Sequence, residues 1–203
     1  MHNFFVIADI IGIIAFTISG FLVGIRHKLD LLGVGISAVL TALGGGIVRD
    51  TILGRTPFAF SEYYPVMTLI FVLFFASLFK LLRHDSVEKK GIFVFSDTIG
   101  LVAFSVTGAL LGIDANYNFF GVISLSFITA IGGSMLRDIL INQVPIILIS
   151  DFYGSIALIV SLLLYLLHVS AILNSSSLIA VSFFAIILRL IAYYKQWHLP
   201  NIK

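Results

Sequence analysis

The sequence contains two copies of one pattern, separated by 88 residues. Residues 9–25 align with 97–113 and residues 33–57 align with 121–145, and eighteen of these forty-two aligned positions are identical. Self-similarity at a fixed offset is the signature of an internal structural repeat. The identical positions include polar and charged residues, so shared hydropathy alone does not explain the match: Asp9/Asp97, Thr41/Thr129, Gly45/Gly133, Arg49/Arg137 and Asp50/Asp138.

Long apolar stretches fill most of the chain. Hydrophobic residues make up 60% of it and charged residues 11%, which is outside the range of soluble domains. A helix that crosses a hydrocarbon core needs about 20 mostly apolar residues. Seven stretches meet this condition, and they predict an all-α membrane protein of seven transmembrane helices: Phe4–Ile25, Leu31–Leu53, Pro65–Leu82, Ile92–Ile113, Phe119–Ile141, Asp151–His168 and Ser177–Tyr194.

Each copy of the repeat contains three predicted spans. Because three is an odd number, the second copy must enter the membrane upside down relative to the first. We therefore expect residues 1–90 to form one three-helix unit and residues 91–170 an inverted second unit. Residues 171–203 are expected to form the seventh helix and a cytoplasmic tail.

Lys and Arg fall mainly on one side of the predicted spans. Ten of them lie on the side of the C-terminus, whereas only Arg49 and Arg55 lie on the other side. Loops near membrane ends carry more Lys and Arg on the cytoplasmic side. The distribution predicts a multi-pass protein of the cell (inner) membrane, with its N-terminus outside and its C-terminus in the cytoplasm.

Several function classes lack the residues that they need. The chain has no cysteine, and its five histidines have no ligand spacing, so no structural metal is expected. No P-loop, nucleophile elbow or zinc-protease motif occurs, which argues against an enzyme. The basic residues form no stripe for nucleic acid. We expect no organic cofactor and no nucleic-acid partner.

The second span of each copy carries a threonine followed by a cluster of small residues: Thr41 with Gly44, Gly45 and Gly46, and Thr129 with Gly132, Gly133 and Ser134. Each glycine weakens a helix by about 1 kcal/mol relative to alanine, so a cluster favours a break. A break inside the membrane exposes carbonyl oxygens, which together with hydroxyl groups suit alkali cations. These positions are therefore predicted pore-lining or ion-binding residues. Close helix packing by the glycines is the alternative interpretation.

An arginine and an aspartate end each motif, as Arg49-Asp50 and Arg137-Asp138. They are predicted to be pore-mouth charges, or alternatively anchors at the membrane interface. Adjacent side chains on a helix diverge by about 100°, so each arginine is expected to be poorly aimed at its own neighbouring aspartate. Their partners should then come from other helices.

Two further acids, Asp9 and Asp97, lie a few residues inside their spans. An ionisable residue at membrane depth is by default functional or paired. The topology places Asp9 in the same half of the membrane as Arg49, and Asp97 in the same half as Arg137. We expect two symmetric Asp–Arg contacts, with a first-turn aspartate stabilised by the helix dipole as the alternative.

The repeat, its inversion, the seventh helix and the sequences GGGxxRD and GGSxxRD together resemble the prokaryotic trimeric intracellular cation (TRIC) channel family, over essentially the whole chain. The resemblance implies a homotrimer in the lipid bilayer, with a pore inside each protomer lined by kinked second and fifth helices and passing K⁺ and Na⁺. Bound lipid is a further candidate ligand. Animal members place a lysine beside the fifth-helix motif, but no lysine occurs between Lys90 and Lys195, so their lipid control does not transfer.

A monovalent cation channel is therefore the function that we expect. Bacterial sequences of this type are also grouped as glycine transporters, and inverted repeats with broken helices equally suit alternating access. A secondary transporter of a small amino acid such as glycine is thus the alternative. A lipid-binding or scaffolding protein is a third class, which would use the glycines for packing and leave the mirrored polar residues without a role.

Overall fold

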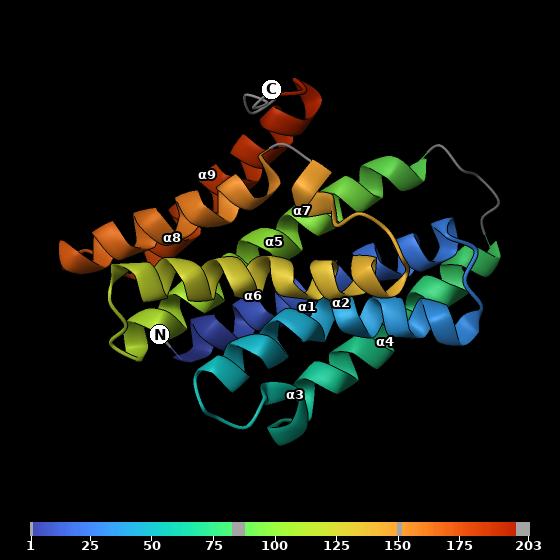
Figure 1. The fold of residues 1–203 in the computed structure, drawn as a ribbon, viewed down its shortest axis with the longest axis horizontal. Coiled ribbons are helices and arrows are strands. Elements are labelled where there is room, and N and C mark those ends of the chain that lie inside the picture. The colour runs from blue at the N-terminus through green and yellow to red at the C-terminus, as the bar shows by residue number, and fades with distance from the viewer. Residues whose placement is uncertain (1, 83–87, 150–151, 198–203) are drawn as a thin grey trace.

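A computed structural model describes residues 2–82, 88–149 and 152–197, and this part of the chain contains nine α-helices and no strand (Figure 1). Two of the helices have only four residues. The bounds are α1 His2–Arg26, α2 Leu31–Ile52, α3 Phe58–Ser61, α4 Tyr64–Leu82, α5 Glu88–Asp114, α6 Phe119–Leu140, α7 Ile146–Ile149, α8 Tyr153–Val169 and α9 Ser175–Tyr194.

Five of these helices are long and apolar enough to cross a membrane: α1, α2, α5, α6 and α9. Two further apolar helices, over Tyr64–Leu78 and Tyr153–Val169, are shorter. The prediction of an all-helical membrane protein is confirmed, while the count of seven spans stays a prediction. The expected start of the sixth span, Asp151, lies outside the described residues.

The two short helices were not predicted. Helix α3 begins directly after Pro57 and α7 directly after Pro145, which are equivalent positions of the repeat. Proline has a fixed φ that suits the start of a helix, and its missing N–H costs nothing there. Each second-span helix is therefore followed by a tight turn and one helical turn before the next long helix begins.

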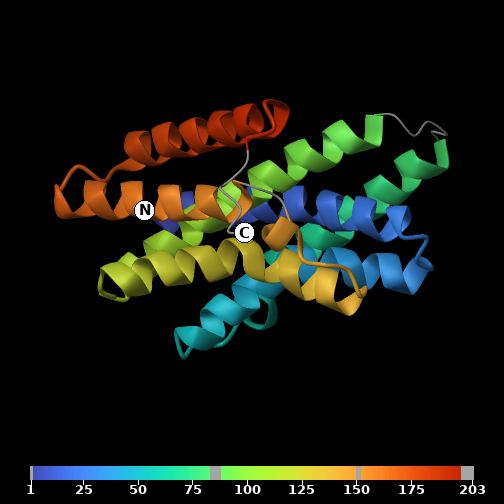
Figure 2. The same cartoon turned by 45° about the horizontal axis from the view of Figure 1, so that its top comes forward.

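Helices α1, α2, α5 and α6 form the centre of the molecule (Figures 1 and 2). Helices α1 and α5 pack against each other. Helix α2 packs against α1 on one side and against α6 on another. Helix α4 lies along one side of this group against α1, whereas α8 and α9 lie along the other side against α5. The rings of Phe16 and Phe104, which are equivalent in the repeat, stack at 5.4 Å between α1 and α5.

Local contacts recur at the 88-residue offset. The side chain of Asp30 accepts the Gly33 N–H at 2.7 Å at the start of α2, and Asn118 accepts the Gly121 N–H at 2.9 Å at the start of α6. A carboxylate and an amide oxygen are both good N-caps. The repeat seen in the sequence is therefore also a repeat of local structure.

The glycine clusters lie where α2 crosses α6. A methyl group added to Gly45 would collide with the carbonyl oxygen of Thr129, and one added to Gly133 would collide with that of Thr41. Both helices are continuous α-helices through these clusters. The expectation of broken helices is wrong, because contact between the two backbones holds each glycine cluster inside an intact helix.

We expect Gly45→Ala and Gly133→Ala to destabilise the protein, because the added methyl groups cannot be accommodated without moving a backbone. Overpacking of this kind costs roughly 1–3 kcal/mol. Thermal unfolding of the purified protein in detergent measures the effect. Gly35→Ala, on the same helix α2, is the matched control, because nothing lies within 4 Å of its added methyl group. Equal stability of all three variants would contradict the packing role.

Candidate functional site

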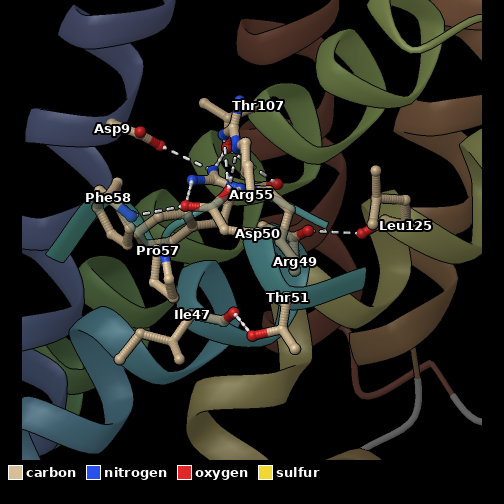
Figure 3. A network of polar contacts seen from close by, with 12 residues as sticks. Asp9, Ile47, Arg49, Asp50, Thr51, Arg55, Pro57, Phe58, Thr107 and Leu125 are labelled. Atoms are coloured by element: carbon tan, nitrogen blue, oxygen red, sulfur yellow. Dashed lines mark hydrogen bonds and ion pairs between the residues drawn. The ribbon is translucent and has the colours of Figure 1, made fainter. Parts of the chain in front are cut away.

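Arg49 is the centre of a buried polar cluster at one end of the bundle (Figure 3). Its Nε donates to Asp50 Oδ1 at 2.8 Å and its Nη2 to Asp50 Oδ2 at 3.3 Å. Its Nη1 lies 3.4 Å from Asp9 Oδ1 and 3.5 Å from the hydroxyl of Thr107. One guanidinium thus joins α1, α2 and α5.

Aromatic rings flank this guanidinium. Its central carbon lies 5.1 Å from the ring centroid of Phe58 and 5.5 Å from that of Phe5. The ring face carries partial negative charge, which attracts a cation that has lost its water. The rings and the two carboxylates together replace the hydration that Arg49 loses on burial.

Asp50 is the main acceptor of the cluster. Besides Arg49, the guanidinium of Arg55 donates to Oδ1 through Nη2 at 2.6 Å and Nε at 3.0 Å. The backbone N–H of Phe58 donates to Oδ2 at 2.8 Å. These contacts hold the turn after α2 and the start of α3 against the end of α2.

The expectation that each arginine avoids its own neighbouring aspartate is wrong in both repeats. Arg137 repeats the geometry of Arg49, since its Nε donates to Asp138 Oδ1 at 2.8 Å. Arginine is long enough to curl its planar fork back along the helix surface, so the angle between adjacent Cα–Cβ bonds does not decide the pairing. The predicted contact of Arg49 with Asp9, from another helix, is nevertheless present.

The second cluster lies at the other end of the bundle. The backbone N–H of Ile146 donates to Asp138 Oδ2 at 2.9 Å, which repeats the Phe58 contact at the 88-residue offset. The Nη1 of Arg137 donates to the hydroxyl of Thr41 at 3.3 Å and so reaches from α6 into the first repeat. The two repeats are therefore locked into each other by polar contacts as well as by packing.

Asp97 does not mirror Asp9. It accepts the hydroxyl proton of Ser19 at 2.9 Å, and among the described residues no ion pair joins it to Arg137. It also interacts with the hydroxyl of Tyr153 and with the charges of Arg137 and Arg189. The predicted second contact is thus replaced by a hydroxyl contact, because Arg137 directs its nitrogens to Asp138 and Thr41.

Sequence reasoning missed several members of the two clusters. Tyr64 donates its hydroxyl to Asp9 Oδ2 at 3.3 Å. Tyr64 and Tyr153 are the first residues of α4 and α8 and lie 89 residues apart, so a repeat alignment with a one-residue gap would have paired them. Arg189 comes from α9, outside the repeat, and its guanidinium lies 5.2 Å from the Tyr153 ring centroid.

Arg49, Arg137 and Arg189 are at most 4% exposed. All three are among the cations from which the orientation is predicted; without them, eight Lys and Arg remain on the predicted cytoplasmic side and one, Arg55, on the other. Burial of arginine away from water requires paired carboxylates, which is what the structure provides at Arg49 and Arg137.

Hydroxyl groups are buried on the four helices that carry the two clusters. They come from α1, α2, α5 and α6, and all are buried: Thr17, Ser19, Ser37, Thr41, Thr98, Ser105, Thr107, Ser126, Thr129 and Ser134. Most donate to a carbonyl of their own helix, as Thr41 and Thr129 do to Ser37 and Leu125. Within the described residues, the hydroxyl of Thr17 has no hydrogen-bond partner. The interior of these four helices therefore contains these ten buried hydroxyl groups.

The first cluster borders a cavity of about 340 Å³. Aromatic, polar and charged side chains line it, from α1, the turn after α2, α3 and α4: Phe5, Val6, Asp50, Arg55, Thr56, Phe58, Ser61, Glu62 and Tyr64. The side chain of Arg55 is 41% exposed, whereas that of Asp50 is fully buried. The cavity gives water access to the edge of the first cluster.

The family model described as "Glycine transporter" matches residues 6–80 and again residues 94–169. The two matches begin 88 residues apart, which is the offset of the internal repeat. The UPF0126 membrane protein YvgT of Bacillus subtilis is 33% identical over 95% of this chain and 94% of its own length. The UPF0126 inner membrane protein YadS of Escherichia coli is 29% identical over 74% of this chain and 72% of its own.

Solved structures with the same fold are cation channels. A prokaryotic TRIC channel crystallised in 0.5 M KCl is 31% identical and matches with a TM-score of 0.86 over 98% of this chain and all of the other. A TRIC cation channel studied for its conductance is 35% identical, with a TM-score of 0.84 over 97% of this chain and 96% of the other. This chain is a membrane protein that belongs to the prokaryotic TRIC family, whose sequence model is the one described as "Glycine transporter".

We expect Asp50→Asn to destabilise the protein more than Asp138→Asn. The first substitution leaves two arginines without their shared carboxylate, whereas the second leaves one. Removing one partner of a buried ion pair costs about 3–5 kcal/mol. Thermal unfolding in detergent compares the two variants, and a smaller loss for Asp50→Asn would contradict this assignment of contacts.

Proposed function

We propose that this protein is a channel for monovalent cations such as K⁺ and Na⁺, with a path inside each protomer. The observation that carries the proposal is the set of buried hydroxyls on the four helices that carry the two buried Arg–Asp clusters, in a chain with the fold of TRIC cation channels. Ionisable and polar groups at membrane depth mark ion paths. The path would run from the 340 Å³ cavity along α1, α2, α5 and α6.

Because α2 and α6 are continuous, side-chain hydroxyls rather than main-chain carbonyls would replace the hydration shell of the ion. Thr41, Thr129 and Ser134 are the candidates from the motifs, and Thr17 is a further one because its hydroxyl is free of protein partners among the described residues. The hydroxyls are buried, so the conformation described is closed between its two ends. The glycine crossing of Gly45 and Gly133 would form one wall of the path.

The assembly and the orientation belong to the same proposal. The protein would form a homotrimer of seven-span protomers, each made of two inverted units and a last helix. A related structure from Rhodobacter sphaeroides is described as a trimeric intracellular cation channel orthologue. The proposed orientation, with the N-terminus outside, turns the cavity beside Arg55 toward the outside of the cell.

A transporter of a small amino acid is the second candidate. The family description names glycine, and the cavity beside the first cluster carries both a guanidinium and a carboxylate, from Arg55 and Glu62. Such a pair could bind the carboxylate and the ammonium of a zwitterion. Inverted repeats are also common in secondary transporters.

Two measurements on the purified protein separate the candidates. In a planar bilayer with a KCl gradient, a channel gives resolved current steps that reverse near the K⁺ potential. In proteoliposomes, a transporter gives saturable uptake of labelled glycine that is coupled to an ion gradient. Coupled glycine uptake without current steps would overturn the channel proposal.

We expect Asp9→Asn and Asp97→Asn each to lower K⁺ conductance by about twofold or more. A unit charge at about 10 Å in water changes the local cation concentration by a factor of about two, and these substitutions remove negative charge near the path. Single-channel recording measures the effect, and elution as an intact oligomer checks folding. Asp30→Asn is the matched control, because the equivalent Asn118 already caps α6 in the same way. Wild-type conductance in both variants would remove these acids from the path.

A further inference from the structure

Arg55, the second cation of the first cluster, is much more exposed than the other charged side chains of the two clusters. Arg55 lies on the turn after α2, and its side chain is 41% exposed and lines the cavity. Its partner Asp50 is already bound by Arg49 and by the Phe58 N–H. Asp9 and Asp50 share Arg49, so Arg55 supplies the second positive charge that balances the two carboxylates, and its exposed side chain lines the cavity.

The repeat supplies a built-in comparison for this residue. The position equivalent to Arg55 is Gln143, and the two turns have the same backbone structure. The Arg55 N–H donates to the carbonyl of Asp50 at 3.1 Å, and the Gln143 N–H donates to that of Asp138 at 2.8 Å. The residue before each also has a positive φ, 67° at Gly54 and 56° at Asn142. The same turn thus carries a charge in one repeat and a neutral amide in the other.

The second cluster obtains its extra arginine from a different element. Arg189 comes from α9, is 4% exposed, and interacts electrostatically with Asp97. Arg55 instead lies on a turn, and its side chain is 41% exposed although the carboxylate that it binds is fully buried. The two ends of the proposed path therefore differ in how far their extra cation is exposed.

We propose that Arg55 is the residue that limits cation entry at the cavity end of the path, by placing a positive charge on the wall of the cavity. The inference rests on the proposed channel function. The guanidinium of Arg55 is partly exposed at the cavity whereas the carboxylate that it binds is fully buried, so an entering cation meets the positive member of the pair first and is repelled. The side chain of Arg55 also occupies part of the cavity wall.

The first test is single-channel recording of the full-length protein. Arg55→Gln, which copies the turn of the second repeat, should raise K⁺ current entering from the cavity side about twofold at a salt concentration of about 0.01 M. At about 1 M, where the Debye length is about 3 Å, the variant and the wild type should conduct equally. Arg55→Lys keeps the charge and should stay near the wild type. A channel that conducts normally but is unaffected by Arg55→Gln at low salt would overturn the inference and leave the channel function intact.

The second test does not depend on conduction. Because the chain has no cysteine, Ser61→Cys places a single thiol on the wall of the cavity without further changes. Arg55→Gln in this background should speed its labelling by a trimethylammonium-bearing methanethiosulfonate about twofold and slow labelling by a sulfonate-bearing one. Arg26→Gln is the control, since it removes the same charge at the other end of α1, about 30 Å away, and should leave both rates unchanged.

The two tests separate the possible failures. Labelling rates that do not respond to Arg55→Gln would overturn the role of Arg55 in the cavity, whatever the currents show. If Arg55→Gln changes the labelling rates but the wild-type protein passes no K⁺, the proposed channel function is overturned, and with it the role of Arg55 in ion entry. Labelling and low-salt current that both respond support the inference.

Discussion

The burial of arginine in a membrane protein is the constraint on which the rest of this structure depends. Arg49 and Arg137 are almost completely excluded from water, and a bare guanidinium in a medium of low dielectric constant is very costly. Each is therefore held by the aspartate next to it in the chain. That aspartate also binds the first N–H of a short helix, so the ion pair determines how the chain turns back after α2 and after α6.

The same constraint explains why the two repeats interlock. The remaining donors of each guanidinium reach hydroxyls of the other repeat, Thr107 from Arg49 and Thr41 from Arg137. A single unit of three helices would lose both hydroxyl contacts, and Nη1 of Arg49 would keep only Asp9. Both arginines therefore make their full set of hydrogen bonds only when both copies of the repeat are present. The equivalent residues Gly45 and Gly133 meet where α2 crosses α6.

The sequence was sufficient to predict the long apolar helices and the internal repeat, because apolar length and the 88-residue offset depend on composition and spacing alone. It also predicted the contact of Asp9 with Arg49, since topology placed both in one half of the membrane. It failed where the reach of a side chain decides the outcome: Arg49 and Arg137 curl back to their own neighbours, and Asp97 accepts from Ser19. Propensity also misled at the glycines, because contact with the opposite backbone keeps those helices whole. Arg189 could not be placed, since the repeat gives no information about α9.

The contact of α2 with α6 at Gly45 and Gly133 has a mechanical consequence. With main-chain atoms touching at the crossing, the two helices cannot move closer there, and they can separate only by losing the contact. Tilting about that point remains possible, as about a pivot. A small rotation then moves the helix starts, Leu31 and Phe119, much further than Arg49 and Arg137, which lie four residues, about 6 Å, from Gly45 and Gly133. The two arginines would thus stay almost in place with their aspartates while the opposite ends of the two helices swing.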